Sequence, residues 1–342
     1  MKLLSLRTDS PQLAAATGTV LCHDVHGAGR RGGVLFKGSV LTEEDIERLR
    51  QLPGQEVHLL ALEPGDVKED EAARRLAVAV SGPGIEIKGP HQSRFALVAA
   101  HRGVLRVKPE ILQQLNCIEY VSVYTWYDGQ VVDQGDEVGA AKVTPLAVDE
   151  ATVQAAERLA AAHAPVVDVA PFRHHRVGMV VSERLDERAR GRFEASIRSR
   201  LAWFGSELLA VRYVDPDGAS VARAIRELVD AGADLILTGG GNAIDPADPM
   251  LHALQELRIP LEKLGVPAHP GSMLWLAYLD AVPVLGLPSC GMYSRTTAMD
   301  IVLPQLLTGR RLRREELAAY GHGGHLTREM AFRFAPYEGA ED

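Results

Sequence analysis

The second half of the chain alternates strand-like and helix-like segments, and this alternation constrains the fold more than any other feature. The strand-like runs lie at 176–183, 206–214 and 233–241, and helical segments follow them at 185–205, 216–232 and 248–259. A strand pair around Asp280 and a helix at 293–309 complete the series. Strands joined by helices of this length need crossover connections, which build a mostly parallel sheet. The pattern therefore predicts an α/β fold.

The first half has a different texture, and a Pro- and His-containing stretch at 163–176 separates the two halves. Residues 1–165 read as a strand-rich α+β region with two or three helices, of which 42–52 and 68–82 have the clearest caps and spacing. We expect an α/β domain over 173–312. The charged residues 313–342 are expected to form a tail, with one helix followed by a loose end.

Composition excludes several classes of protein. The net charge is −8 and the sequence pI is about 5.9, whereas nucleic-acid binding needs a basic footprint. No run reaches the roughly 20 apolar residues of a membrane span, and the first ten residues are too polar for a signal-peptide core. The cysteines, Cys22, Cys117 and Cys290, lie too far apart for a disulfide framework. We expect a cytoplasmic protein.

A glycine-rich stretch, "LTGGGNAIDPADP", follows the apolar run at 233–238. Ligands of doubly wound sheets bind beyond the carboxyl ends of the strands. Gly239, Gly240 and Gly241 adopt positive φ at little cost and leave their N–H groups uncovered, an arrangement that favours a phosphate group. The structural alternative is a plain turn, and Asn242 has its own alternative role of relaxing a left-handed turn.

Two further loops are expected at the same edge of the sheet. "PAHPGSM" offers a Pro-Gly turn, Pro270–Gly271, with the hydroxyl of Ser272, and "GLPSCGMYS" connects a strand to a helix. The second loop contributes four candidate ligand-binding residues: Pro288, Ser289, Cys290 and Gly291. For Cys290, a buried small side chain is the alternative to a reactive thiol at a helix N-terminus. Three such loops in one α/β half indicate a binding site.

These loops resemble the motifs of a known family, the molybdopterin-binding domain shared by molybdopterin molybdotransferases, molybdopterin adenylyltransferases and competence-damage-type pyrophosphatases. "VVSERL" is similar to the family's "STGDE" turn, "TGGGNAIDPADP" to its glycine loop, "AHPGSM" to its "KPGKP" turn and "GLPSCGMYS" to its "GLPGNPVSA" loop. The resemblance covers residues 173–312 and implies a three-layer αβα domain. "AATGTVLCHDV" and "KGSVLTEEDIERLRQL" resemble the amino-terminal region of the molybdotransferases.

The resemblance implies a molybdopterin ligand, and it assigns site residues. The cofactor would contact Ser182, Glu183 and Thr238 besides the glycines and the two loops. Asp245 and Asp248 would be catalytic, with Mg²⁺ held at Asp245. The structural alternatives are a solvated strand-end charge for Glu183 and a helix N-cap for Asp248. The family assembles as oligomers, so we expect a homodimer.

Three functions follow from the resemblance. The first is a molybdotransferase-like protein of molybdenum cofactor biosynthesis. The second is a non-catalytic carrier or regulator of the cofactor. It is motivated by His269, Ser272 and Met273, which stand around the turn where the family has lysines, and by the altered "PSCG" loop. The third is a Mg²⁺-dependent dinucleotide pyrophosphatase of the competence-damage type.

Overall fold

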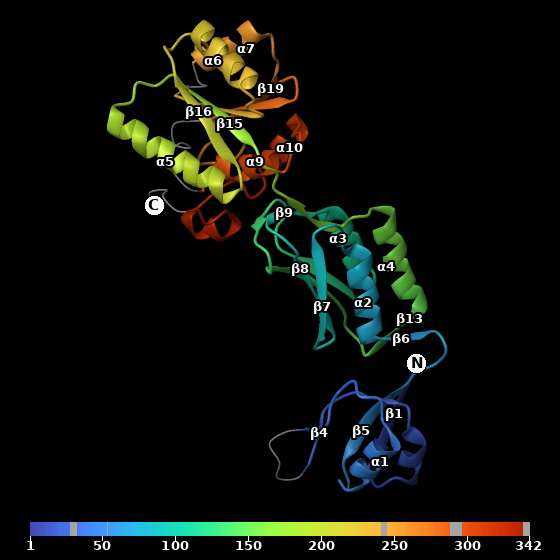
Figure 1. Cartoon of the computed structure of the whole chain (residues 1–342). Coiled ribbons are helices and arrows are strands. Elements are labelled where there is room, and N and C mark those ends of the chain that lie inside the picture. Colours follow the sequence, from blue (N-terminus) through green and yellow to red (C-terminus); the bar gives the residue numbers. More distant parts are fainter. Residues whose placement is uncertain (28–32, 53, 241–244, 288–295, 338–342) are drawn as a thin grey trace. The chain divides into compact units, whose positions relative to one another are not determined.

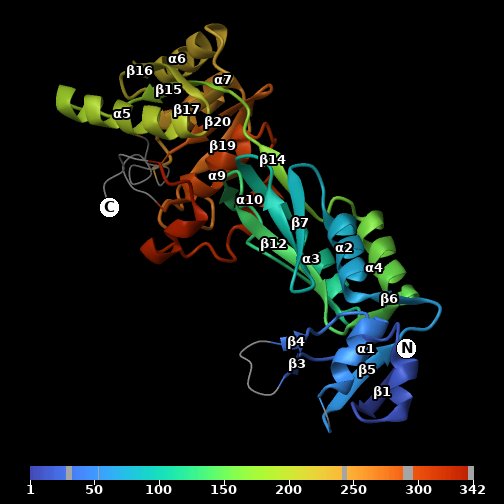
Figure 2. The ribbon, with the colours of Figure 1, turned by 60° about the horizontal axis from the view of Figure 1, so that its bottom comes forward.

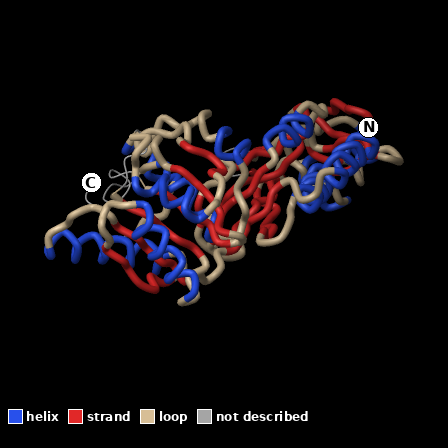
Figure 3. The backbone as a smooth tube through the Cα atoms, turned by 90° about the horizontal axis from the view of Figure 1, so that it is seen from above, coloured by secondary structure: helices blue, strands red, loops and turns tan. Residues whose placement is uncertain are grey.

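A computed structural model describes residues 1–27, 33–52, 54–240, 245–287 and 296–337, and these are the described residues below. The chain divides into two compact units (Figure 1). Unit 1 comprises Met1–Ala100, Val107–Trp126 and Gly135–Asp168, and unit 2 comprises His101–Arg106, Tyr127–Gln134 and Val169–Asp342. Helices and strands mix throughout (Figure 3), so the expected α/β class is confirmed. Among the described residues, no helix combines the length and the apolar character that crossing a membrane requires.

The first part of unit 1 is a three-stranded antiparallel sheet of order β1-β5-β2 with a helix beside it. Its elements are β1 (Lys2–Arg7), η1 (Pro11–Ala16), β2 (Val20–Leu21), β3 (Val25–His26), β4 (Gly33–Leu35), α1 (Glu43–Arg50) and β5 (Glu56–Ala61). The helix α1 lies within the expected segment 42–52. Thr42 accepts a hydrogen bond from the Asp45 amide and Asp45 accepts one from the Thr42 amide, while Ile46 and Leu49 are buried.

The second part of unit 1 is an antiparallel sheet of order β10-β12-β8-β7, on which α2 packs. Its elements are β6 (Asp66–Lys68), α2 (Glu69–Val80), β7 (Ile85–His91), β8 (Arg94–Ala99), α3 (Pro109–Asn116), β10 (Val121–Thr125), β12 (Glu137–Val143), β13 (Ala147–Asp149) and α4 (Glu150–Ala162). The sequence pattern does not assign α3 or α4. The helix α3 has no side-chain cap at Lys108, and α4 buries only Val153, Ala156 and Ala160, so its apolar periodicity is weak.

Unit 2 is built on a six-stranded sheet of order β16-β15-β17-β20-β19-β18. β16, β15, β17 and β20 run parallel, and β19 is antiparallel to both of its neighbours. The strands are β15 (Arg176–Val181), β16 (Glu207–Tyr213), β17 (Leu235–Gly239), β18 (Leu261–Leu264), β19 (Trp275–Leu279) and β20 (Val282–Gly286). The hairpin of β19 and β20 turns at Asp280, as the sequence predicts. A smaller sheet has the order β11 (Val131–Val132), β9 (Gly103–Val107), β14 (Val167–Pro171).

Helices cover both faces of the six-stranded sheet (Figure 2). The helices are α5 (Glu187–Trp203), α6 (Gly218–Asp230), α7 (Pro249–Leu257), α9 (Ala298–Leu307) and α10 (Arg314–Ala319). Side chains of β15 alternate between the faces: Met179 and Val181 pack with α5 and α9, and Val180 packs with α6 and α7. The chain crosses from β15 to β16 on one side and then from β16 to β17 on the other side of β15. The strand order therefore reverses between β15 and β17, which makes this position the topological switch point of the sheet.

The carboxyl-terminal segment differs from the expected loose tail. After α10, a 3₁₀ helix spans η2 (Arg328–Arg333), and Leu317, Leu326 and Tyr337 are buried in the core shared by α5 and α9. The His269 amide donates to Gly324 O at 2.7 Å, and the Leu326 amide donates to His269 O at 2.8 Å. The buried residues are widely and irregularly spaced, so sequence periodicity does not reveal that this segment belongs to the core.

Candidate functional site

The carboxyl ends of β15, β17 and β20 bring together the first group of expected site residues. The Ser182 amide donates to Gly239 O at 3.2 Å, and the Leu287 amide donates to Thr238 O at 2.9 Å. Thr238 is 1% exposed and Ser182 5% exposed. The residues after three neighbouring parallel strands therefore meet at one edge of the sheet, at the switch point where open α/β sheets bind ligands.

Gly240 occupies a position that only glycine fits without rearrangement. Its φ is +88°, and a Cβ there would lie 2.6 Å from both the amide nitrogen and the Cβ of Glu183. Gly240, in the turn after β17, is thus in close contact with Glu183, which follows β15. A side chain is therefore excluded at this position, and phosphate-binding loops use glycines because a missing side chain leaves the backbone amides uncovered.

The hydroxyl of Ser182 is the second notable feature of this edge. Its Oγ is buried and has no hydrogen-bond partner among the described residues. A buried polar group left without a partner costs about 1–3 kcal/mol. A ligand oxygen at the end of β15 would satisfy this hydroxyl, so its burial beside Gly239 is consistent with a binding site.

The turn that contains Pro270 and Gly271 lies against the start of α9. The Ala298 amide donates to Pro270 O at 2.9 Å, and a Cβ on Gly271, whose φ is +98°, would lie 2.9 Å from the Ala298 nitrogen. Ser272 is exposed, and its carbonyl accepts from the Val266 amide. The turn therefore uses one amide of the α9 N-terminus for its own hydrogen bond. The role of Pro270, Gly271 and Ser272 in ligand binding stays a prediction.

The start of α9 is fixed by a buried carboxylate. Asp300 Oδ2 accepts from the Thr297 amide at 2.8 Å and from the Thr297 hydroxyl at 3.0 Å. Burial raises the pKa of Asp300, because the charged form is costly away from water. Asp300 is not among the residues predicted from the sequence, although Thr297 and Asp300 have the spacing of a capping box.

The two acidic residues after the glycines have different surroundings. Asp245 is exposed and accepts a hydrogen bond from the Ala247 amide at 2.9 Å. Asp248 is 3% exposed and accepts from the Met250 amide at 2.8 Å and the Leu251 amide at 3.3 Å. These contacts make Asp248 the N-cap of α7, which is the structural alternative for this residue. Its catalytic role, like that of Asp245, stays a prediction.

Six expected site residues lie outside the described residues: Gly241, Asn242, Pro288, Ser289, Cys290 and Gly291. Within the described ranges, no group of three or more His, Cys, Asp or Glu side chains has the arrangement of a metal site. The binding of Mg²⁺ by Asp245 therefore stays a prediction, with Asp245 as its single carboxylate ligand.

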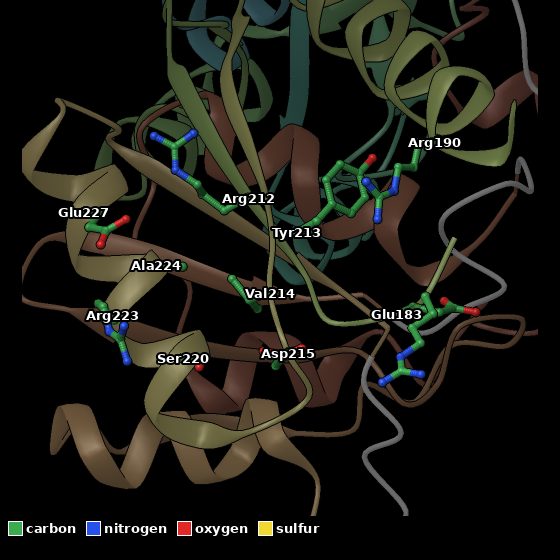
Figure 4. Close-up of a pocket in the computed structure, with 11 residues that line it drawn as sticks. Glu183, Arg190, Arg212, Tyr213, Val214, Asp215, Ser220, Arg223, Ala224 and Glu227 are labelled. Atoms are coloured by element: carbon green, nitrogen blue, oxygen red, sulfur yellow. The ribbon is translucent and has the colours of Figure 1, made fainter. Parts of the chain in front are cut away.

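A groove of about 500 Å³, which the sequence does not predict, opens beside this edge (Figure 4). Glu183 and Arg184 line it from the end of β15, while other lining residues come from β16, α5 and α6. We call it the arginine groove, after Arg184, Arg190, Arg212 and Arg223. The available sequence signal was the arginine-rich segment 184–192, which reads as an ordinary solvated helix start.

Comparisons with known proteins give partial resemblances. A domain family of unknown function, DUF8806, matches residues 11–59. A search of curated protein sequences gave no match. The solved structures that are similar to this chain include the following three. The molybdopterin biosynthesis MoeA protein from Pyrococcus horikosii has a TM-score of 0.30 and 13% identity, over 71% of this chain and 79% of that protein.

The second structure is a MogA protein, with a TM-score of 0.24 and 24% identity over 35% of this chain and 86% of that protein. The third is a molybdenum cofactor biosynthesis protein from Pyrococcus furiosus, with a TM-score of 0.22 and 12% identity over 94% of this chain and 64% of that protein.

Proposed function

We propose that this protein binds molybdopterin, or its adenylylated form, at the carboxyl ends of β15, β17 and β20, and that it acts in molybdenum cofactor biosynthesis. The observation that carries the proposal is the contact of Gly240 with Glu183. It holds the first half of the glycine loop, at the switch point of the sheet, in a conformation that leaves no room for a side chain. The motif resemblance over 173–312 supplies the identity of the ligand.

The described residues suit a ligand that carries a phosphate group. Gly239 and Gly240 would receive the phosphate on their backbone, and Ser182 would donate its buried hydroxyl to a ligand oxygen. Pro270 and Gly271 would bound the ligand on the side of α9. In this proposal Asp245 holds Mg²⁺ against the ligand, because its carboxylate is exposed near the end of the glycine loop.

Titration of the purified protein with molybdopterin, followed by the change in pterin fluorescence, tests this proposal. We expect saturation with about 50 µM ligand or less and no binding by Gly240→Asp, because the new side chain would collide with Glu183. Gly205→Ala is the matched control: Gly205 has a φ of +74°, lies before β16 at the opposite end of the sheet and has open space around it. Equal binding by Gly240→Asp and wild type would overturn the proposal.

The carrier or regulator is the second candidate function, and the position of Asp248 favours it. One of the two carboxylates predicted for catalysis caps α7 through two amides, which leaves Asp245 as the exposed acid of this loop. A molybdate-insertion assay separates the two functions. Turnover that disappears in Asp245→Ala supports a molybdotransferase, whereas cofactor binding without turnover in the wild type supports a carrier.

Two further expectations belong to this proposal. The dinucleotide pyrophosphatase is tested by incubation with ADP-ribose and Mg²⁺, since release of AMP would establish it and its absence with several divalent metals would remove it. The homodimer is tested by light scattering at several protein concentrations, where a mass of twice 37.0 kDa is expected.

A further inference from the structure

The arginine groove runs along the carboxyl-terminal end of β16, which is an edge strand of the six-stranded sheet. Arg190 comes from α5, Arg212 from β16 and Arg223 from α6, so three separate elements supply its cations (Figure 4). Its volume of about 500 Å³ lies in the range of small-molecule sites, which is roughly 300–1,000 Å³. The groove is therefore large enough for a ligand bigger than a single phosphate.

One of these arginines is held in place by its surroundings. Arg190 Nε donates to Leu185 O at 3.1 Å, and its Cζ lies 4.2 Å from the ring centroid of Tyr213. The Tyr213 hydroxyl donates in turn to Glu194 Oε1 at 3.2 Å. The guanidinium is thus stacked on an aromatic ring that is itself fixed. Because Arg190 is already ordered, its side chain loses less entropy when a ligand binds.

The four arginines of the groove also lack the carboxylate partners that arginines have elsewhere in this chain. Arg74 pairs with Glu71 at 2.7 Å, and Arg102 pairs with Asp133 at 2.9 Å. Across the described residues, no carboxylate oxygen lies within 4.0 Å of a guanidinium nitrogen of the four groove arginines, although Glu183, Asp215 and Glu227 also line the groove and Arg223 interacts with Asp217 at longer range, where it helps to lower the pKa of that carboxyl. In an acidic protein, cations gathered without such pairs remain available to an anionic ligand.

We propose that the arginine groove binds a ligand that carries at least two phosphate groups, such as a nucleoside diphosphate. Guanidinium groups match phosphate oxygens in bidentate geometry, and cations distributed over three elements suit separate phosphates better than one. The groove goes beyond the proposed pterin site: Glu183 borders both, but Arg212 lies on β16, which β15 separates from the strand that ends in the glycine turn, and Arg223 lies on α6. The inference does not depend on molybdopterin binding.

Isothermal titration of the whole chain with inorganic pyrophosphate, orthophosphate and ADP tests the proposal. We expect pyrophosphate to bind about ten-fold more tightly than orthophosphate, because it engages more than one guanidinium. ADP at the affinity of pyrophosphate would show that the phosphates alone are recognised, and tighter binding of ADP would show that the nucleoside contributes as well. Absence of binding by pyrophosphate at about 1 mM would overturn the proposal.

Substitutions localise the site. Arg212→Ala and Arg223→Ala, which change exposed side chains, are each expected to weaken pyrophosphate binding about ten-fold. Arg226→Ala is the matched control, because Arg226 is exposed on the same helix α6 but lines a neighbouring hollow. Equal weakening by the control would reveal a diffuse charge effect and overturn the assignment.

The glycine turn provides the last discrimination. Gly240→Asp should retain pyrophosphate binding while it loses molybdopterin binding, since Gly240 does not line the groove and Glu183, which the new side chain would displace, is an acid that an anionic ligand does not need. Loss of pyrophosphate binding in this variant, with Arg223→Ala unaffected, would place pyrophosphate at the glycine turn and overturn the proposal. Failure of molybdopterin binding alone would overturn the proposed function and leave the groove intact.

Discussion

The hydroxyl of Tyr337 donates a hydrogen bond to Oδ1 of Asp300, so the last described residue of the chain is joined to the first turn of α9. The two side chains are 4% and 6% exposed, and the Cζ of Arg200 lies 4.6 Å from the centroid of the Tyr337 ring. Because Ala298 of the same turn binds Pro270 O, the carboxyl-terminal segment supports an edge of the candidate site.

The first prediction concerns this contact. Tyr337→Phe removes the donor and leaves a buried acceptor unsatisfied, which should cost about 1–3 kcal/mol. For a unit of this size, each kcal/mol lowers the midpoint of thermal unfolding by about 2–4 °C, a shift that calorimetry resolves. Tyr127→Phe is the control, because Tyr127 is 63% exposed and should tolerate the change. Equal midpoints for Tyr337→Phe and wild type would show that this contact does not stabilise unit 2.

The second prediction separates the two acids after the glycine loop. Asp248→Ala removes an N-cap that accepts from two amides of α7, so it should destabilise unit 2 by about 1 kcal/mol. Asp245→Ala changes an exposed side chain and should leave the thermal midpoint within about 1 °C, while it weakens ligand or Mg²⁺ binding. Thermal unfolding and ligand titration of both variants check this. If only Asp248→Ala weakened binding, Asp248 and not Asp245 would be the residue that contacts the ligand or Mg²⁺.

The sequence predicts much of unit 2 because its signals are local. The capped helices, the apolar strands and the turn at Asp280 each depend on neighbouring residues, and all recur in the structure. Crossover connections between successive strands then favour parallel pairing, which places the loops of Ser182 and Thr238 at one end of the sheet. The Pro270 loop reaches the same end because it precedes β19, which runs antiparallel to β20. The approach of Gly240 to Glu183 follows from that geometry and from the need for positive φ.

The rest depends on contacts between distant residues. The arginine groove combines side chains from α5, β16 and α6 that have no common spacing in the sequence. The burial of Tyr337 against Asp300 likewise joins segments whose apolar residues have no period. Asp248 shows the converse, since one residue satisfies both the family motif and the N-cap pattern, and only the hydrogen bonds distinguish them.

The third prediction isolates the close approach at Gly240 from its backbone conformation. Gly240 and Gly205 have φ values of +88° and +74°, but only Gly240 has atoms within 3 Å of an added Cβ. Gly205→Ala should therefore cost only about 1–2 kcal/mol of left-handed strain. Gly240→Ala should cost more and also impair molybdopterin binding. Thermal unfolding and titration of both variants test this, and identical behaviour would mean that backbone strain alone matters.

The fourth prediction concerns the pH dependence of unit 1. Arg75 on α2 forms paired hydrogen bonds of 2.7–2.8 Å with Glu150 and Glu157 of α4. These bonds lower the pKa of Glu150 from 4.5 to about 2, and they lower the pKa of Glu157 as well. A carboxylate whose pKa is depressed by folding stabilises the protein above its ordinary pKa, and this contribution disappears as the pH falls towards the folded pKa.

Arg75→Gln should therefore lower the thermal midpoint of unit 1 at pH 6, and the gap to wild type should shrink as the pH falls from about 4.5 to about 2. Arg74→Gln is the control, because Arg74 precedes Arg75 directly on α2. Its partner Glu71 belongs to the same helix, and about half of each of the two side chains is exposed. Its gap should be small at every pH, because exposed pairs within one helix contribute little. A gap for Arg75→Gln that stays constant from pH 6 to 2 would show that Arg75 acts through packing and not through its charge.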